Sequence, residues 1–107
     1  MEKLELQRVP FTRDADNKLR FLKAKMRITP NVICRIGFCL SLALDTIPPA
    51  ILEDDKSRDI SRYTLFGKYD VAYEALLAQW KYEVGTAISM DELCIRHMNR
   101  GALMVSA

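Results

Sequence analysis

Half of the 107 residues are hydrophobic and 28% are charged, a composition that excludes a disordered chain. This length suits one domain, residues 1–107, with a single modest core. Three cysteines, an odd number, argue against a disulfide framework. The longest apolar stretch, residues 36–44, is too short to span a membrane. We therefore expect a cytoplasmic protein with no membrane association.

Positive charge is concentrated in the first third of the chain. Residues 1–35 contain nine Lys or Arg against four Asp or Glu, a net charge of +5, whereas residues 36–107 contain seven against ten, a net charge of −3. A chain that separates its charges in this way can present a concentrated positive face to a polyanion. Nucleic acid is therefore the first partner to consider.

A short strand followed by an amphipathic helix is predicted at the N-terminus. Apolar and polar residues alternate over residues 4–11, which favours a strand, and Pro10 lacks the N–H that an inner strand would need. Residues 13–27 form the predicted helix, with Thr12 as its N-cap. The apolar stripe of this helix consists of Ala15, Leu19, Leu22 and Met26.

Basic residues flank the apolar stripe of this helix on both sides. At about 100° per residue, Arg13, Arg20 and Arg27 form one row. Two lysines, Lys18 and Lys25, line the other flank. Such a face is either an ordinary solvated surface or a contact surface for phosphates. The excess of positive over negative charge favours contact with phosphates. The candidate DNA-binding residues are Arg13, Lys18, Arg20, Lys23, Lys25 and Arg27, with Lys3 and Arg8 as lesser candidates.

A second helix is predicted over residues 30–44, because Thr29 and Pro30 match an N-cap followed by proline at the first helical position. This helix is apolar nearly all round, with Arg35 as its only charge. A helix of this kind is buried by its own domain together with a partner subunit, so we expect a homo-oligomer. Gly37 would permit the close approach of another helix. The candidate interface residues are Phe21, Ile33, Ile36, Gly37 and Leu40.

The second half of the chain is predicted to contain two further helices. Residues 45–59 are expected to form a loop, because Pro48 and Pro49 stop the preceding helix. Residues 60–66 fit either a short strand or a turn. A third helix follows over residues 70–84, with apolar residues along one face.

Local signals mark the ends of these helices. Asp70 is the predicted N-cap of the third helix and Gly85 its terminator. Ser89 and Glu92 match the S-x-x-E capping box that begins a last helix ending near Leu103. The fold class is therefore mainly α, with four helices after a short N-terminal strand. Its strand–helix–helix beginning is also that of ribbon-helix-helix proteins, which contact DNA.

The sequence offers little for metal or covalent chemistry. Cys34 and Cys39 lie about 140° apart around one predicted helix and point in different directions. Cys94 and His97 can meet on one helical face, but two ligands do not make a metal site, and nothing orients a Cys–His nucleophile. Phosphate loops, dinucleotide fingerprints and H-E-x-x-H motifs are absent. We therefore expect no enzyme, no metal and no cofactor.

Four short stretches, in their order along the chain, resemble one protein family. They are residues 31–42 (NVICRIGFCLSL), 63–69 (YTLFGKY), 75–77 (ALL) and 97–101 (HMNRG). The family is DndE, the small subunit of bacterial DNA phosphorothioation systems, which replace a non-bridging phosphate oxygen with sulfur. The resemblance implies a DNA-binding component rather than the subunit that carries out sulfur transfer. The partners it implies are double-stranded DNA, nicked DNA in particular, and other subunits of the complex. It also implies a homo-oligomer, with the tetramer as the expected form.

Pattern and resemblance together predict DNA binding through the basic helix without strong sequence preference, because Lys and Arg faces read phosphates and not base edges. Two alternatives stay open. A ribbon-helix-helix regulator would be a dimer that prefers one operator, and a protein scaffold would hold its partners through the apolar helix and Phe21. Sulfur carriage by Cys34 or Cys39 is not favoured, because both lie on the helix expected to be buried and a reactive thiolate needs exposure.

Overall fold

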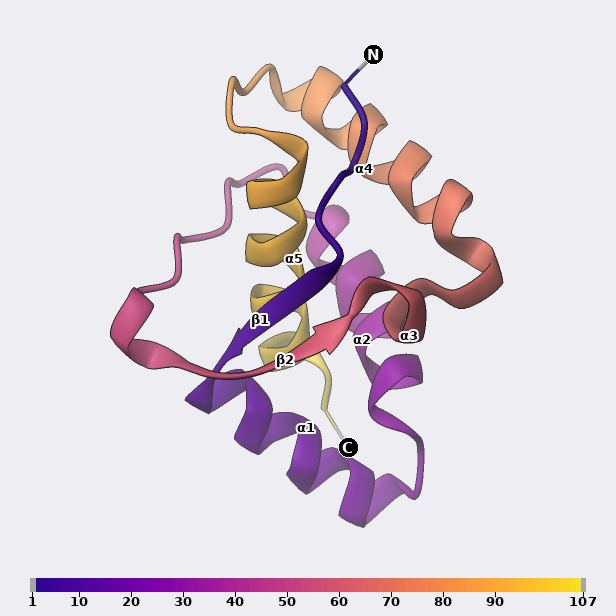
Figure 1. Ribbon diagram of the computed structural model, residues 1–107, viewed down its shortest axis with the longest axis vertical. Helices are drawn as coiled ribbons and strands as arrows, with labels where there is room; N and C mark the ends of the chain where they lie inside the picture. Colours follow the sequence, from indigo (N-terminus) through magenta and orange to yellow (C-terminus); the bar gives the residue numbers. More distant parts are fainter. Residues whose placement is uncertain (1, 107) are drawn as a thin grey trace.

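The computed structural model describes residues 2–106, which form a mainly helical fold (Figure 1). The predicted class, mainly α with four long helices after an N-terminal strand, is confirmed, and one further helix is only five residues long. No helix in this range is long and apolar enough to cross a membrane. In chain order the elements are β1 (Arg8–Thr12), α1 (Arg13–Met26), α2 (Pro30–Leu42), a 3₁₀ turn (Glu53–Asp55), β2 (Lys56–Ser61), α3 (Arg62–Phe66), a second 3₁₀ turn (Gly67–Tyr69), α4 (Asp70–Val84) and α5 (Met90–Met104).

Helix α1 lies where the sequence predicts it. The Thr12 hydroxyl accepts a hydrogen bond from the Ala15 N–H at 3.1 Å, so the predicted N-cap is confirmed. Three members of the apolar stripe are fully buried and Met26 packs against them from a half-buried position. Burial of this stripe fixes the rotation of α1 about its axis, and with it the direction in which its basic residues face.

The N-terminal strand is shorter and starts later than predicted, at Arg8 instead of residue 4. The preceding residues form an arm that runs beside α4 and α5 (Figure 1). The backbone N–H of Leu4 donates to the Glu74 carboxylate at 2.6 Å, and those of Glu5 and Leu6 donate to Asp91 at 2.8 and 3.1 Å. Side chains therefore satisfy the polar backbone groups of the arm in place of a strand partner.

The partner of β1 is β2, which lies in the region predicted to be loop and ambiguous turn. The two strands are antiparallel, with Val9 opposite Ile60. Apart from Ile60 the strand β2 is polar, so it lacks the alternation of apolar residues from which strands are predicted. Residues 62–66, where a strand or a turn was expected, form the one-turn helix α3. The strand that pairs with β1 thus belongs to the same chain.

Helix α5 lies at the centre of the fold and contacts α1, α2, α4 and β1 (Figure 1). It meets α2 at two glycines. A methyl group on Gly37 would overlap the backbone of Gly101, and one on Gly101 would overlap the backbone of Gly37. The close approach predicted for Gly37 is therefore confirmed, and it is an approach within the chain.

The ends of the last two helices mostly follow the predicted signals. Gly85 ends α4 with a left-handed φ of 78°, and the Ser89 hydroxyl accepts the Glu92 N–H at 3.1 Å to cap α5. The prediction for Asp70 was wrong, because Tyr69 occupies the N-cap position. Asp70 is the first helical residue, and its carboxylate instead binds the Arg62 guanidinium of α3.

Candidate nucleic-acid interface

The basic side chains of α1 line both sides of its buried stripe. Five of the six candidates are exposed, and Lys18 is half-buried. Lys25 lies with its ammonium nitrogen 5.7 Å from the centre of the Phe21 ring. Within residues 2–106, five of these six candidates form no ion pair: Arg13, Lys18, Lys23, Lys25 and Arg27. Helix α1 thus carries cationic groups that no carboxylate of the described chain neutralises.

Two other candidates already have acidic partners. The Nε of Arg8 lies 3.0 Å from an Asp59 oxygen, and an Arg20 nitrogen lies 3.3 Å from Asp16. The Arg8–Asp59 pair is exposed on both sides, and such pairs contribute only about 0.2–1 kcal/mol, so a phosphate can compete for Arg8. Lys3 is exposed on the N-terminal arm, which lies at the opposite end of the molecule from α1 (Figure 1). The fold therefore does not bring Lys3 together with the α1 cations.

Acidic residues lie close to the start of α1. The Arg13 guanidinium donates to the backbone carbonyl of Asp54 at 3.1 Å, in a 3₁₀ turn made entirely of Glu and Asp. Asp14 and Asp16 also lie in the first turn of α1, while Lys23 and Lys25 lie in the last. The positive charge is therefore concentrated toward the C-terminal half of α1.

A buried carboxylate, Asp16, joins α1 to the sheet. It is only 2% exposed, and one of its oxygens lies 2.6 Å from the Arg58 Nε of β2, while the Ser57 hydroxyl donates to the other at 3.0 Å. Burial by itself would raise the pKa of Asp16, but hydrogen bonds from Arg20 and Ser57 and the Arg58 charge lower it overall. Sequence reasoning missed Arg58, because no apolar pattern marks β2.

The candidate interface residues of α2 divide into two sets. Ile33 and Gly37 are buried inside the chain, where Gly37 lies against α5, and neither presents a surface to a partner. Ile36 and Leu40 are 43% and 41% exposed, and Phe21 of α1 is 55% exposed. Other exposed apolar residues continue the row along and beyond α2: Val32, Leu44 and Ile47. The outer side of α2 is therefore an uncovered apolar surface.

The thiols and the histidine are poorly placed for chemistry. Burial raises the pKa of Cys34 and that of Cys94 to about 12. Burial, together with the nearby Arg100 charge, lowers the pKa of His97 to about 3. Cys39 is exposed, so the expectation that both cysteines of this helix are buried was wrong for Cys39. Among the described residues no three His, Cys, Asp or Glu side chains gather to hold a metal.

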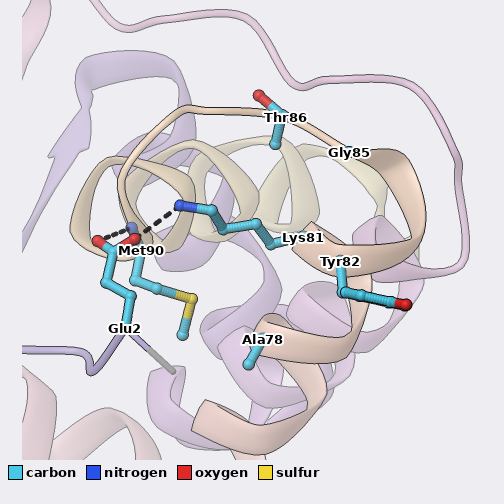
Figure 2. Close-up of a pocket in the computed structure, with 7 residues that line it drawn as sticks. All are labelled: Glu2, Ala78, Lys81, Tyr82, Gly85, Thr86 and Met90. Atoms are coloured by element: carbon cyan, nitrogen blue, oxygen red, sulfur yellow. Dashed lines mark hydrogen bonds and ion pairs between the residues drawn. The ribbon is translucent and has the colours of Figure 1, made fainter.

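A hollow of about 370 Å³ lies between the N-terminal arm, the end of α4 and the start of α5 (Figure 2). The Glu2 carboxylate accepts hydrogen bonds from the Lys81 ammonium at 2.6 Å and from the Met90 N–H at 2.8 Å. The hydrogen bond from Lys81 is the main cause of the lowered pKa of Glu2. These groups satisfy one another, and they fasten the arm to the beginning of α5.

A family model matches this chain in sequence, and solved structures match it in fold. The family model of the DNA sulphur modification protein DndE matches residues 8–107. The fold is similar to the crystal structure of DndE from Escherichia coli B7A involved in DNA phosphorothioation modification, with a TM-score of 0.70, 19% identity, and 94% and 96% of the two chains covered.

A crystal structure of a DndE G21/24K mutant involved in DNA phosphorothioation is also similar. Its TM-score is 0.66 at 21% identity, with 94% of this chain and 99% of that chain covered. No curated protein matches the chain. The match to the family model over nearly the whole length is decisive: this chain belongs to the DndE family of DNA sulphur modification proteins.

Proposed function

We propose that the chain is a DNA-binding accessory subunit of a cytoplasmic DNA phosphorothioation system. It holds duplex DNA against α1, while other subunits of the complex carry out the sulfur chemistry. The observation that carries this proposal is the row of exposed, unneutralised cations along α1 in a member of the DndE family. The protonated, buried thiols of Cys34 and Cys94 and the neutral, buried histidine agree with a role that is not catalytic.

The contacts proposed for α1 are with phosphates and carry little sequence information. Lysine and arginine on a convex helix surface neutralise the backbone and release its counterions, which gives affinity that falls steeply with salt. Nicked duplexes are the favoured substrate in this proposal. A duplex bends more easily at a break, so its phosphates can meet several basic faces of one homo-oligomer, with the tetramer as the expected form.

The experiment is a titration of the purified protein against intact and singly nicked duplexes of one sequence, at two salt concentrations. We expect salt-sensitive binding that is tighter for the nicked duplex. Replacing two cations, Lys23→Glu with Lys25→Glu, weakens binding by roughly tenfold or more at low salt and reduces the salt slope by about two phosphate contacts. A panel of unrelated sequences binds with similar affinity; a single preferred operator would instead favour a ribbon-helix-helix regulator.

Lys68 offers a matched control for the loss of positive charge. Like Lys25 it is an exposed lysine whose ammonium group lies over an aromatic ring, in this case Tyr69 at 5.3 Å, but it lies outside α1. Lys25→Glu should weaken DNA binding and Lys68→Glu should change it much less. Equal effects of the two substitutions would show that net charge, and not the α1 surface, determines affinity. Absence of any duplex binding would leave the protein scaffold as the better explanation.

A further inference from the structure

A second hollow, of about 500 Å³, lies where α1 ends and the chain turns toward α2. It is lined by Arg20, Lys23, Ala24, Arg27, Ile28 and Thr29. The three cationic residues follow one another at spacings of three and four, so they lie along the same side of the helix end. No carboxylate lines the hollow, and only Arg20 has an acidic partner in residues 2–106.

The backbone conformation at Arg27 is unusual. With φ 56° and ψ 35°, Arg27 is left-handed, and it is the only residue other than glycine with positive φ in the described chain. This is the position after a helix where glycine is the usual residue, because a side chain there is strained. The chain nevertheless has an arginine at this turn, and its side chain lines the hollow.

A recess with three cations calls for a ligand that concentrates negative charge. Each internal phosphate of a duplex carries a single charge, and these charges are spread along the backbone. A phosphomonoester carries between one and a half and two charges on one group near neutral pH, with three strong acceptor oxygens. Arginine and lysine together can satisfy those oxygens with charge-assisted hydrogen bonds.

We propose that the hollow formed by Arg20, Lys23 and Arg27 binds the terminal phosphate of a DNA strand. The inference rests on the proposed function, since it deepens the role of the same helix in DNA binding. It adds recognition of a strand end by charge: the protein distinguishes an end that carries a phosphate from one that carries only hydroxyls. The phosphate can belong to a 5′ or a 3′ end, which share this chemistry and are separated by experiment.

The test uses duplexes of one sequence that are closed by a hairpin at one end. The open blunt end carries a 5′-phosphate, a 3′-phosphate or hydroxyl groups alone, and a dumbbell closed at both ends serves as the end-free reference. We expect one of the phosphorylated ends to bind roughly five- to tenfold more tightly than the hydroxyl end. The hydroxyl end and the dumbbell should bind alike, because both lack the monoester.

Arg27→Gly removes the cation while giving the left-handed position its preferred residue, so the fold should be at least as stable in thermal unfolding. This variant should bind all duplexes more weakly, and the ratio of phosphorylated to hydroxyl affinity should fall to about one. Lys25→Gln is the matched control. It removes one charge from the other flank of α1, outside the hollow, so it should lower every affinity and leave the ratio unchanged.

Equal affinity for phosphorylated and hydroxyl ends would overturn the inference. A ratio that survives in Arg27→Gly would overturn it as well, because the monoester would then be bound elsewhere. Both results leave the proposed function intact provided that the dumbbell binds in a salt-sensitive way. Failure of the dumbbell to bind would instead contradict the proposed function itself.

Discussion

His97, the single histidine of the chain, is fully buried and takes part in a polar network with Ser41 and Arg100. The Arg100 Nε donates to the Ser41 hydroxyl oxygen at 2.8 Å, and that hydroxyl lies 2.7 Å from the His97 Nδ1. The direction of this hydrogen bond depends on the histidine tautomer, and the lowered pKa of His97 keeps its ring neutral near neutral pH. Arg100 also donates to the backbone carbonyl of Ser41 at 2.8 Å, near the end of α2. A second positive charge on His97 would face Arg100 in a buried setting.

The stability of the fold should therefore fall as the pH decreases below that of a normal histidine. The pKa of His97 is about 3 in the folded chain against 6.5 for the free group. The unfolded chain thus binds the proton first, so stability is complete above pH 6.5 and declines as the pH falls toward 3. Between pH 6 and pH 5 we expect a loss of about 1.4 kcal/mol per pH unit in urea unfolding.

His97→Asn should remove this slope, because asparagine does not titrate. The carboxylates with lowered pKa values, Glu2 and Asp16, affect stability only below the pKa of a free carboxyl group, outside this range. A slope that persists in the asparagine variant would show that a group other than His97 titrates on unfolding.

At the scale of elements, the contact of α2 with α5 depends on the absence of side chains at Gly37 and Gly101. Glycine weakens a helix by roughly 1 kcal/mol relative to alanine, so each is unfavourable locally. The approach of the two backbones accounts for both glycines, because any Cβ would force the helices apart.

Asn99 of α5 joins this helix to β1. Its side chain accepts a hydrogen bond from the Thr12 N–H at 2.8 Å and donates one to the Pro10 carbonyl at 2.9 Å.

Gly37→Ala should destabilise the protein by about 2–3 kcal/mol or more, in spite of the better helix propensity of alanine, because a methyl group has no room against the Gly101 backbone. Gly85→Ala is the comparison. Its site is open space, so only the left-handed backbone of Gly85 opposes the substitution, at about 1–2 kcal/mol. Urea unfolding of both variants measures the difference. A smaller loss for Gly37→Ala than for Gly85→Ala would mean that the two helices can separate without cost.

The helices were predictable from the sequence because their signals are local. The cap at Thr12, the stripe of α1 and the glycine that ends α4 each act within a few residues. The sheet and the N-terminal arm were not predictable, since β2 carries no apolar alternation and the arm depends on Glu74 and Asp91, which lie some 70 or more positions later. For the candidate site, the basic face follows from α1 alone, whereas the hollow beside Arg27 requires the turn into α2.

At the scale of the whole molecule, two different surfaces are left uncovered. One is the cationic side of α1, and the other is the apolar row on the outer side of α2. A large exposed apolar surface marks a site of association, and a polyanion has no chemical reason to cover it. We therefore expect the two surfaces to have different partners, DNA for α1 and a second copy of the chain for α2. Assembly through α2 would place several α1 surfaces on one particle and raise the affinity for DNA through multivalency.

Ile36→Asp tests this division. Ile36 is 43% exposed, so a charge there leaves the core of the single chain intact but opposes burial of α2 in an interface. Light scattering should show a smaller particle with unchanged helix content, and DNA affinity should fall because the basic faces act singly. Val71→Asp is the matched control, since Val71 is an even more exposed apolar residue, at 76%, on α4. It should keep the size of the parent protein. An Ile36→Asp protein of unchanged size would mean that the apolar row of α2 does not hold copies of the chain together.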